Sequence, residues 1–236
     1  MNIALLTAAG SGTRMNQDIP KQFMHIDNKP LIIYTMEAFQ NHPNIDAILI
    51  VCLDGWRDVL QAYANQFNIT KLKWIVPGGK TGQESIYNGL QTLKEECSED
   101  DIILIHDGNR ALVSFDIISD SIAKCKIHGD AVAVIPCTEA VFRSEDQLTS
   151  TVSIPRENLF RTQTPHTYSL SKLLWAHQRA KENNITNSVA TCTLMVELGE
   201  TIHFSKGAEK NIKITTVEDI DLFKSLLKSE KEYWLK

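Results

Sequence analysis

Three almost unbroken apolar runs constrain the fold of this 236-residue chain more than any other feature. They are Ala47–Cys52, Ile102–Ile105 and Ala131–Ile135, and all are rich in residues that favour strands. Strands without polar alternation are typical of a parallel sheet that is covered on both faces. Helical patterns separate the runs, and one of them follows Pro30. The alternation predicts a doubly wound, mostly parallel α/β sheet, whose ligands bind beyond the carboxyl ends of the strands.

The alternation stops after Pro136. From about 137 to 161 the sequence has no helical period, and short strand-like runs surround a polar turn at Ser144–Gln147. Such an excursion from a compact α/β domain is typically a lid or an oligomerisation arm. We therefore predict one domain over residues 1–236, with a β-arm at about 137–161. The sequence Gln163–His166, which follows the arm, is predicted to be a turn.

The composition restricts the class of partner. The net charge of -5 argues against a nucleic-acid partner, which requires a basic face. No apolar run approaches the roughly 20 residues that span a bilayer, and the first residues read as a strand rather than a signal peptide. We therefore expect a cytoplasmic protein without a membrane partner. The five cysteines are unclustered, so no side-chain metal site is expected.

The first predicted strand, Ile3–Ala8, leads into a loop with Gly10 and Gly12, and positive charges follow at Arg14 and Lys21. Glycines allow backbone N–H groups to approach an anion, because they carry no Cβ and adopt positive φ at little cost. The pattern favours a phosphate-binding loop, and an ordinary glycine turn is the alternative. A dinucleotide fingerprint is excluded, because its third glycine is missing.

A second glycine-rich turn, Gly78–Gly82, joins a predicted strand to a helix that contains Ser85. It is not a P-loop, because Trp74 stands where that motif requires its first glycine. The turn is suited to present N–H groups and the Ser85 hydroxyl to a base or a ribose. A tight turn without a ligand explains it equally well.

Asp107 and Arg110 follow directly after the buried run Ile102–Ile105. Charges at the carboxyl end of a parallel strand are placed for function, because burying them without a partner is costly. Arg110 is suited to grip a phosphate and Asp107 to orient a hydroxyl or a metal, while a simple pair in a turn is the alternative. Lys213 lies in a strand-like segment, Asn211–Thr216, from which it points either to a phosphate or to solvent.

Together these motifs resemble the polyol-phosphate cytidylyltransferases. The resemblance rests on L-x-A-A-G-x-G-x-R-M and P-K-Q-F near the N-terminus, G-G before a helix-opening serine, H-D-x-x-R, a T-P turn, and N-I-K-I-T-T-x-E-D near the C-terminus. Order and spacing match over essentially the whole chain. The nearest branches of the family act on methylerythritol phosphate, in isoprenoid synthesis, and on ribitol phosphate, in teichoic acid or capsule synthesis.

The resemblance implies a Rossmann-like nucleotidyltransferase that transfers CMP from CTP to a polyol phosphate and releases pyrophosphate. We expect 2-C-methyl-D-erythritol 4-phosphate as the acceptor, with ribitol 5-phosphate or a related polyol phosphate as the alternative. A nucleotide-binding paralogue with weak or no transferase activity is the alternative from another class. The resemblance also implies Mg²⁺, bound mainly through the CTP phosphates, and a homodimer that exchanges its arm.

Site residues follow from the same resemblance. Those implied for CTP are Ala8, Ala9, Gly10, Ser11, Gly12, Gly78, Gly79 and Ser85. Those implied for catalysis, by stabilising charge at the α-phosphorus, are Arg14, Lys21 and Lys213. Those implied for the acceptor are Asp107, Arg110 and Lys213, with Thr138 and Arg156 supplied by the partner's arm.

The chain also departs from the family pattern. Gly82 stands where an arginine is usual, and His166 stands where a glutamine follows Thr-Pro. Val189–Ala190 aligns with a Thr-Asp pair that helps to hold the acceptor phosphate. We hypothesise that Ser188 or Thr191 substitutes for that pair, or that the acceptor differs from both named polyols.

Overall fold

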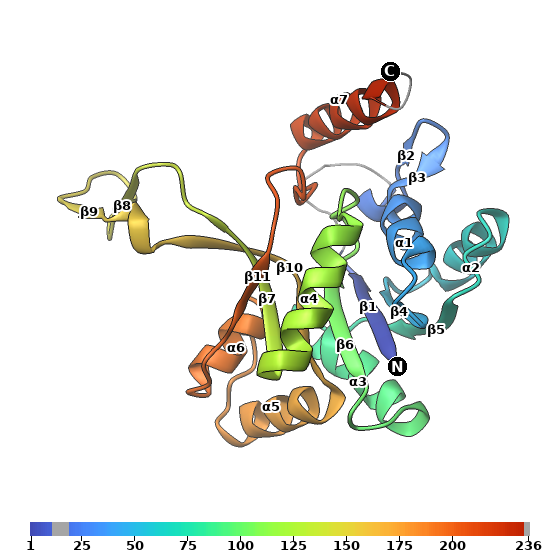
Figure 1. Cartoon of the computed structure of the whole chain (residues 1–236), viewed down its shortest axis with the longest axis horizontal. Coiled ribbons are helices and arrows are strands. Elements are labelled where there is room, and N and C mark those ends of the chain that lie inside the picture. The colour runs from blue at the N-terminus through green and yellow to red at the C-terminus, as the bar shows by residue number, and fades with distance from the viewer. Residues whose placement is uncertain (11–18, 234–236) are drawn as a thin grey trace.

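The computed structural model describes residues 1–10 and 19–233, and its centre is a seven-stranded sheet (Figure 1). The strand order is β11-β7-β10-β6-β1-β4-β5. In chain order these strands are β1 (Asn2–Ala8), β4 (Ala47–Cys52), β5 (Leu72–Pro77), β6 (Ile102–Asp107), β7 (Asp130–Pro136), β10 (Phe160–Ser169) and β11 (Phe204–Lys206). Only β10 runs antiparallel to its neighbours in this sheet. The predicted doubly wound, mostly parallel α/β sheet is confirmed.

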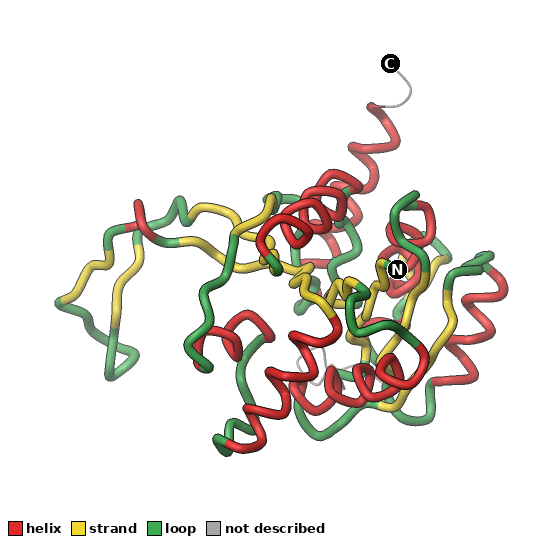
Figure 2. The backbone as a smooth tube through the Cα atoms, turned by 60° about the horizontal axis from the view of Figure 1, so that its bottom comes forward, coloured by secondary structure: helices red, strands yellow, loops and turns green. Residues whose placement is uncertain are grey.

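Helices cover both faces of the sheet (Figure 2). One face carries α1 (Leu31–Asn41), α2 (Arg57–Gln66) and α4 (Phe115–His128), and the other carries α3 (Gly82–Glu96), α5 (Leu170–Glu182) and α6 (Thr191–Glu197). In β1, Ala4 and Leu6 pack into the first core, and Ile3 and Leu5 pack into the second. Successive residues of a strand point to opposite faces, so both sets must be apolar. This two-sided burial explains the unbroken apolar runs.

A third, smaller core lies beside the sheet. It joins α7 (Val217–Tyr233) to the short pair β2 (His25–Ile26) and β3 (Lys29–Pro30). Ile214 is fully buried in this core, which anchors the segment before α7. Among the described helices, none has both the length and the apolar character to cross a membrane.

The segment predicted as an arm forms a hairpin of β8 (Val141–Arg143) and β9 (Val152–Ile154), followed by the short 3₁₀ helix η3 (Arg156–Asn158). It stands away from the rest of the molecule, at the left of Figures 1 and 2. Two of its large apolar side chains are exposed, Phe142 by 64% and Leu148 by 89%. The hairpin therefore adds little to the core of its own chain.

Two local predictions in the second half of the chain were wrong. Gln163–His166 is not a turn but lies inside β10, where the pairing with β7 shifts between Thr162 and His166. A bulge of this kind accommodates a proline, which cannot donate to a ladder. The Asn211–Thr216 segment belongs to no strand. Its backbone pairs instead with Asn109, because Ile214 donates to the Asn109 carbonyl at 3.0 Å and accepts from its side-chain amide at 2.5 Å.

Candidate active site

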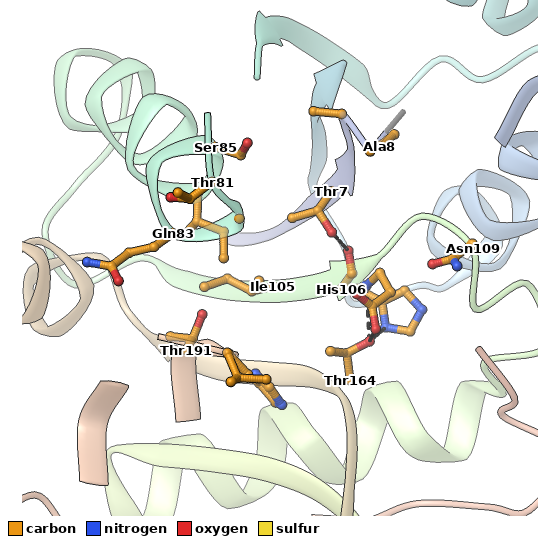
Figure 3. A pocket seen from close by; sticks show the side chains of 18 of the residues that line it. Thr7, Ala8, Thr81, Gln83, Ser85, Ile105, His106, Asn109, Thr164 and Thr191 are labelled. Carbon is orange, nitrogen blue, oxygen red and sulfur yellow. Dashed lines mark hydrogen bonds between the residues drawn. The ribbon is translucent and has the colours of Figure 1, made fainter. Parts of the chain in front are cut away.

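A cavity of about 660 Å³ opens at the carboxyl end of the central strands, where the topology predicts a ligand site (Figure 3). The predicted site residues that line it are Ala8, Ala9, Gly10, Lys21, Gly79, Ser85, Asp107, Arg110 and Lys213. Ser11, Gly12 and Arg14 lie outside the described residues. The structure thus places most of the predicted site residues that it describes in one pocket.

Three predicted residues lie elsewhere. Gly78 sits behind the pocket wall, against Ala9. Thr138 and Arg156 lie on the arm, where the Arg156 guanidinium donates to the Thr138 carbonyl at 2.8 Å. Neither residue reaches the pocket of its own chain.

Gln22 holds the first loop in place, a role that the sequence did not predict. Its side chain is buried, and its amide donates to the carbonyls of Ala8 at 2.7 Å and Gly10 at 3.1 Å. Gln22 belongs to the 3₁₀ helix η2 (Lys21–Phe23), which also brings Lys21 to the pocket. The only sequence signal for Gln22 was its place in the P-K-Q-F motif.

Trp56 supports the same short helix from behind. Its ring stacks on Phe23, with ring centroids 4.5 Å apart and planes 20° apart. Phe23 is almost completely buried. Trp56 is therefore a packing residue that fixes η2, and with it the backbone that carries Lys21.

The second glycine-rich turn packs directly on the first loop. A Cβ on Gly78 would lie 2.3 Å from the Cβ of Ala9, so the two loops approach this closely only with glycine there. Gly79 N–H donates to the Ser85 hydroxyl at 3.0 Å, and Thr81 caps α3 by accepting from Glu84 N–H at 3.1 Å. These bonds fix the Ser85 hydroxyl at the pocket wall.

Asp107 lies between two cations at the end of β6. Its carboxylate accepts from Arg110 Nε at 3.0 Å and from Lys213 Nζ at 2.9 Å, on different oxygens. Burial alone would raise the pKa of Asp107, but Lys213 and Arg110 outweigh it and hold that pKa well below its ordinary value. The Asp107–Arg110 pair considered from the sequence does form, yet both residues also line the pocket and share it with Lys213.

A buried hydrogen-bond chain positions this cluster. Burial lowers the pKa of His106 to about 4, so its imidazole is neutral near neutral pH. Its Nε2 lies 3.2 Å from the Arg110 carbonyl, which only accepts, so Nε2 carries the proton. Nδ1 must then accept from the Thr164 hydroxyl at 3.0 Å, and that hydroxyl oxygen accepts from Asp107 N–H at 3.0 Å. Thr164 comes from the β10 bulge, so this irregularity helps to orient Asp107.

The pocket is cationic although the chain is acidic. Its described lining includes Lys21, Lys80, Arg110 and Lys213, against Asp107 as the only carboxylate among those residues. Burial also lowers the pKa of His166 to about 4, so this lining residue adds no charge near neutral pH. A concentration of fixed positive charge in a cleft attracts and holds phosphate groups.

Two residues that depart from the family pattern, Gly82 and Ala190, also line this pocket. Gln83 ties the two segments together, since its amide donates to Ile185 O at 2.7 Å and accepts from Ser188 N–H at 2.9 Å. The Ser188 hydroxyl is engaged with Glu197. Neutral hydrogen bonds thus connect α3 to the segment that precedes α6.

Comparisons with known proteins agree with this geometry. The model of the family described as IspD, 2-C-methyl-D-erythritol 4-phosphate cytidylyltransferase, matches residues 2–229. A ribitol-5-phosphate cytidylyltransferase of Lacticaseibacillus paracasei is 44% identical over 234 residues, which cover 98% of this chain and 100% of that protein. A 2-C-methyl-D-erythritol 4-phosphate cytidylyltransferase of Clostridium botulinum is 37% identical, over 96% of this chain and 97% of that one.

Solved structures share the fold. The 4-diphosphocytidyl-2C-methyl-D-erythritol synthase from Anaerococcus prevotii has a TM-score of 0.82, covering 96% of this chain and 95% of that chain at 21% identity. The resemblance predicted from the sequence motifs is confirmed. From the family model and the full-length relatives, this chain belongs to the IspD family of polyol-phosphate cytidylyltransferases.

Proposed function

We propose that this protein transfers CMP from CTP to ribitol 5-phosphate and releases pyrophosphate. The observation that carries the proposal is the group of cations, Lys21, Arg110 and Lys213, around one pocket of a cytidylyltransferase fold. The choice of acceptor rests on similarity, since the relative named for ribitol 5-phosphate is 44% identical and the one named for 2-C-methyl-D-erythritol 4-phosphate is 37% identical. Our expectation of methylerythritol phosphate as the acceptor is therefore less well supported than its alternative.

The chemistry needs charge and positioning more than covalent catalysis. A phosphate oxygen of the acceptor bonds to the α-phosphorus of CTP, and the bond to the bridging oxygen breaks, so that pyrophosphate leaves with the electron pair. Lys21 and Lys213 would stabilise the negative charge that develops on the phosphates in transit. Lys213 and Arg110 would hold the acceptor phosphate, while Asp107 fixes the direction of both cations.

The nucleotide would be bound by the two loops that pack on each other. Backbone N–H groups near Gly10 are suited to the triphosphate, and Gly79 and Ser85 are suited to the cytidine. Ser85 keeps its own proton free to donate, because its oxygen accepts from Gly79 N–H. The first loop and the second turn would therefore bind opposite ends of the same substrate.

Mg²⁺ is part of this proposal. In the described ranges, no group of three His, Cys, Asp or Glu side chains is placed to hold a metal ion. Asp107 lines the pocket but already accepts from two cations. The scarcity of side-chain ligands among these residues fits an ion held mainly by phosphate oxygens, as is usual for Mg²⁺ in nucleotide sites. When bound, Mg²⁺ would neutralise charge on the triphosphate.

The experiment is a substrate panel. Pyrophosphate release is measured with CTP, UTP and GTP against ribitol 5-phosphate, methylerythritol 4-phosphate and other polyol phosphates, and the product is identified by ³¹P NMR. We expect turnover with CTP and a diphosphate product with ribitol 5-phosphate. CTP binding without turnover on any acceptor would establish the alternative, a nucleotide-binding paralogue, instead.

We also propose that the protein works as a homodimer in which each arm completes the partner's acceptor site. The exposed Phe142 and Leu148 of the arm supply apolar surface for a second copy, and Arg156 and Thr138 lie together there, outside the pocket of their own chain. Arg156→Ala should raise KM for the acceptor and leave CTP affinity unchanged. A fully active monomer in sedimentation and activity measurements would contradict the shared site.

A further inference from the structure

Two buried polar atoms in the pocket wall have no hydrogen-bond partner among the described residues. They are the Thr191 hydroxyl oxygen and His177 Nε2. The two side chains belong to the lining of the pocket, although the residues are only 4% and 6% exposed. Buried polar atoms are rarely left without a partner, so such a pair at a ligand site points to a group that arrives with the ligand.

The two atoms come from neighbouring elements of the same wall. His177 lies in α5, and its ring packs against Tyr87 of α3 with centroids 5.6 Å apart. Thr191 begins α6. In Figure 3 the Thr191 hydroxyl points into the pocket, toward Gln83 and Ile105, on the opposite side from Ser85. The Thr191 hydroxyl therefore faces the space in which a substrate would lie, and His177 lines the same pocket.

The residues named below add no charge to this part of the wall. Burial lowers the pKa of His177 to about 4, so its ring is neutral near neutral pH. Gly82 and Ala190, at the positions where the family pattern has Arg and Asp, both line the pocket here. A Cβ on Gly82 would meet nothing within 4 Å, so the space beside it is open. The wall thus suits an uncharged polar group rather than a phosphate.

We propose that Thr191 and His177 form a neutral subsite that binds a hydroxyl group of the substrate and contributes to substrate specificity. A hydroxyl fits, because it both donates and accepts, as do the threonine hydroxyl and, through either tautomer, the imidazole nitrogen. The proposal rests on the proposed transferase function, in which the hydroxyl belongs to the polyol chain or to the ribose of CTP. A site that hydrogen-bonds a hydroxyl discriminates strongly against analogues that lack it.

Paired variants test the subsite. Thr191→Val removes the hydroxyl at constant shape, and Thr191→Ser retains it. Thr193→Val makes the same change on the same helix outside the pocket and is the matched control. We expect Thr191→Val to lower kcat/KM by about 10- to 100-fold, while Thr191→Ser and Thr193→Val stay within about threefold of the wild type. His177→Leu should resemble Thr191→Val, and His177→Gln, which restores a polar atom near Nε2, should recover part of the loss.

Two sets of measurements distinguish the source of the hydroxyl. If it belongs to the polyol, Thr191→Val raises KM for ribitol 5-phosphate, while calorimetry finds unchanged affinity for CTP. If it belongs to the ribose, CTP affinity falls, and the difference from wild type disappears with 2′-deoxy-CTP or 3′-deoxy-CTP. Either result supports the subsite and assigns its ligand.

The subsite is overturned if Thr191→Val and His177→Leu, both folded by circular dichroism, match Thr193→Val with both substrates. Failure of the proposed function is a separate result, because it is read from the wild type. If the wild type does not use ribitol 5-phosphate, the variants are compared with the acceptor that it does use. If it uses none, they are compared by CTP and deoxy-CTP binding, and equal binding by all variants also overturns the subsite.

Discussion

Asp107 accepts hydrogen bonds from Lys213 and Arg110 and so fixes both cationic groups in the pocket. The Arg110 guanidinium is held a second time, by the Asn211 carbonyl at 2.7 Å. Fixed cations stabilise a developing charge without reorganising during the reaction. At the scale of single residues, catalysis therefore depends on preorganised positive charge.

Removal of one such cation should reduce turnover strongly. We expect Lys213→Ala to lower kcat by roughly 10²–10³-fold, on the scale of losing one donor to a developing oxyanion. Lys94→Ala, an exposed lysine of α3 outside the pocket, is the control and should behave like the wild type. Steady-state pyrophosphate release measures both. A kcat for Lys213→Ala equal to that of the control would contradict a catalytic role.

At the scale of elements, the site depends on the contact between the first loop and the turn after β5. Gly78→Ala would place a Cβ 2.3 Å from that of Ala9 and force the loops apart. We expect a loss of about 1–3 kcal/mol in the free energy of unfolding, together with weaker CTP binding. Gly82→Ala meets nothing within 4 Å and should not lower the free energy of unfolding. Urea unfolding and calorimetry measure these effects, and equal stability of the two variants would contradict the close contact.

Gln83 makes the second connection between elements, from α3 to the segment before α6. Gln83→Leu removes both hydrogen bonds, to Ile185 and to Ser188, and leaves their backbone groups without these partners. We expect a loss of about 1–3 kcal/mol in stability and a higher KM for the acceptor. Gln91→Leu, two turns further along α3 and outside the pocket, is the matched control. Thermal melts and acceptor kinetics that do not separate the two variants would exclude this positioning role.

A comparison of the predicted with the observed strands shows which parts of the fold could be predicted from the sequence. The apolar runs gave the central strands, because two-sided burial leaves a local pattern. The strand β11 was not predicted, since three residues are too few to show a pattern. Gln163–His166 was wrongly assigned to a turn, because its threonine and proline suit a turn locally, while pairing with both β6 and β7 holds β10 as a strand.

Among the site residues, too, those with a local sequence pattern could be predicted and those that depend on tertiary contacts could not. The ends of strands and the glycine turns are local features, so Asp107, Arg110 and Ser85 could be placed in advance. The roles of Gln22, Gln83 and His177 could not, because each depends on contacts with another segment of the folded chain. Gln83, for example, bonds residues more than 100 positions away. A glutamine gives no sign of such a partner in the sequence.

At the scale of the whole molecule, burial of three histidines makes stability depend on pH. Burial lowers the pKa of His106, His166 and His177 to about 4, against about 6.5 in the unfolded chain. Between about pH 6.5 and pH 4 the unfolded chain binds protons that the folded chain does not, so the free energy of unfolding falls as the pH is lowered. Asp107, whose pKa is also lowered, acts in the same direction only below about pH 4.

Urea unfolding at a series of pH values checks this dependence. Each histidine contributes a slope of up to about 1.4 kcal/mol per pH unit in that window. His177→Leu should therefore flatten the curve by up to that amount, while the difference from wild type stays constant above about pH 7. Curves for the two proteins that run parallel down to about pH 4 would show that His177 is not buried in its neutral form.

Cytidylyl transfer to ribitol 5-phosphate is best tested by the ratio of kcat/KM for ribitol 5-phosphate to kcat/KM for methylerythritol 4-phosphate, measured with CTP and Mg²⁺. We expect a ratio well above one and a diphosphate-linked CDP-ribitol product. A ratio below one, with methylerythritol 4-phosphate turned over efficiently, would contradict it.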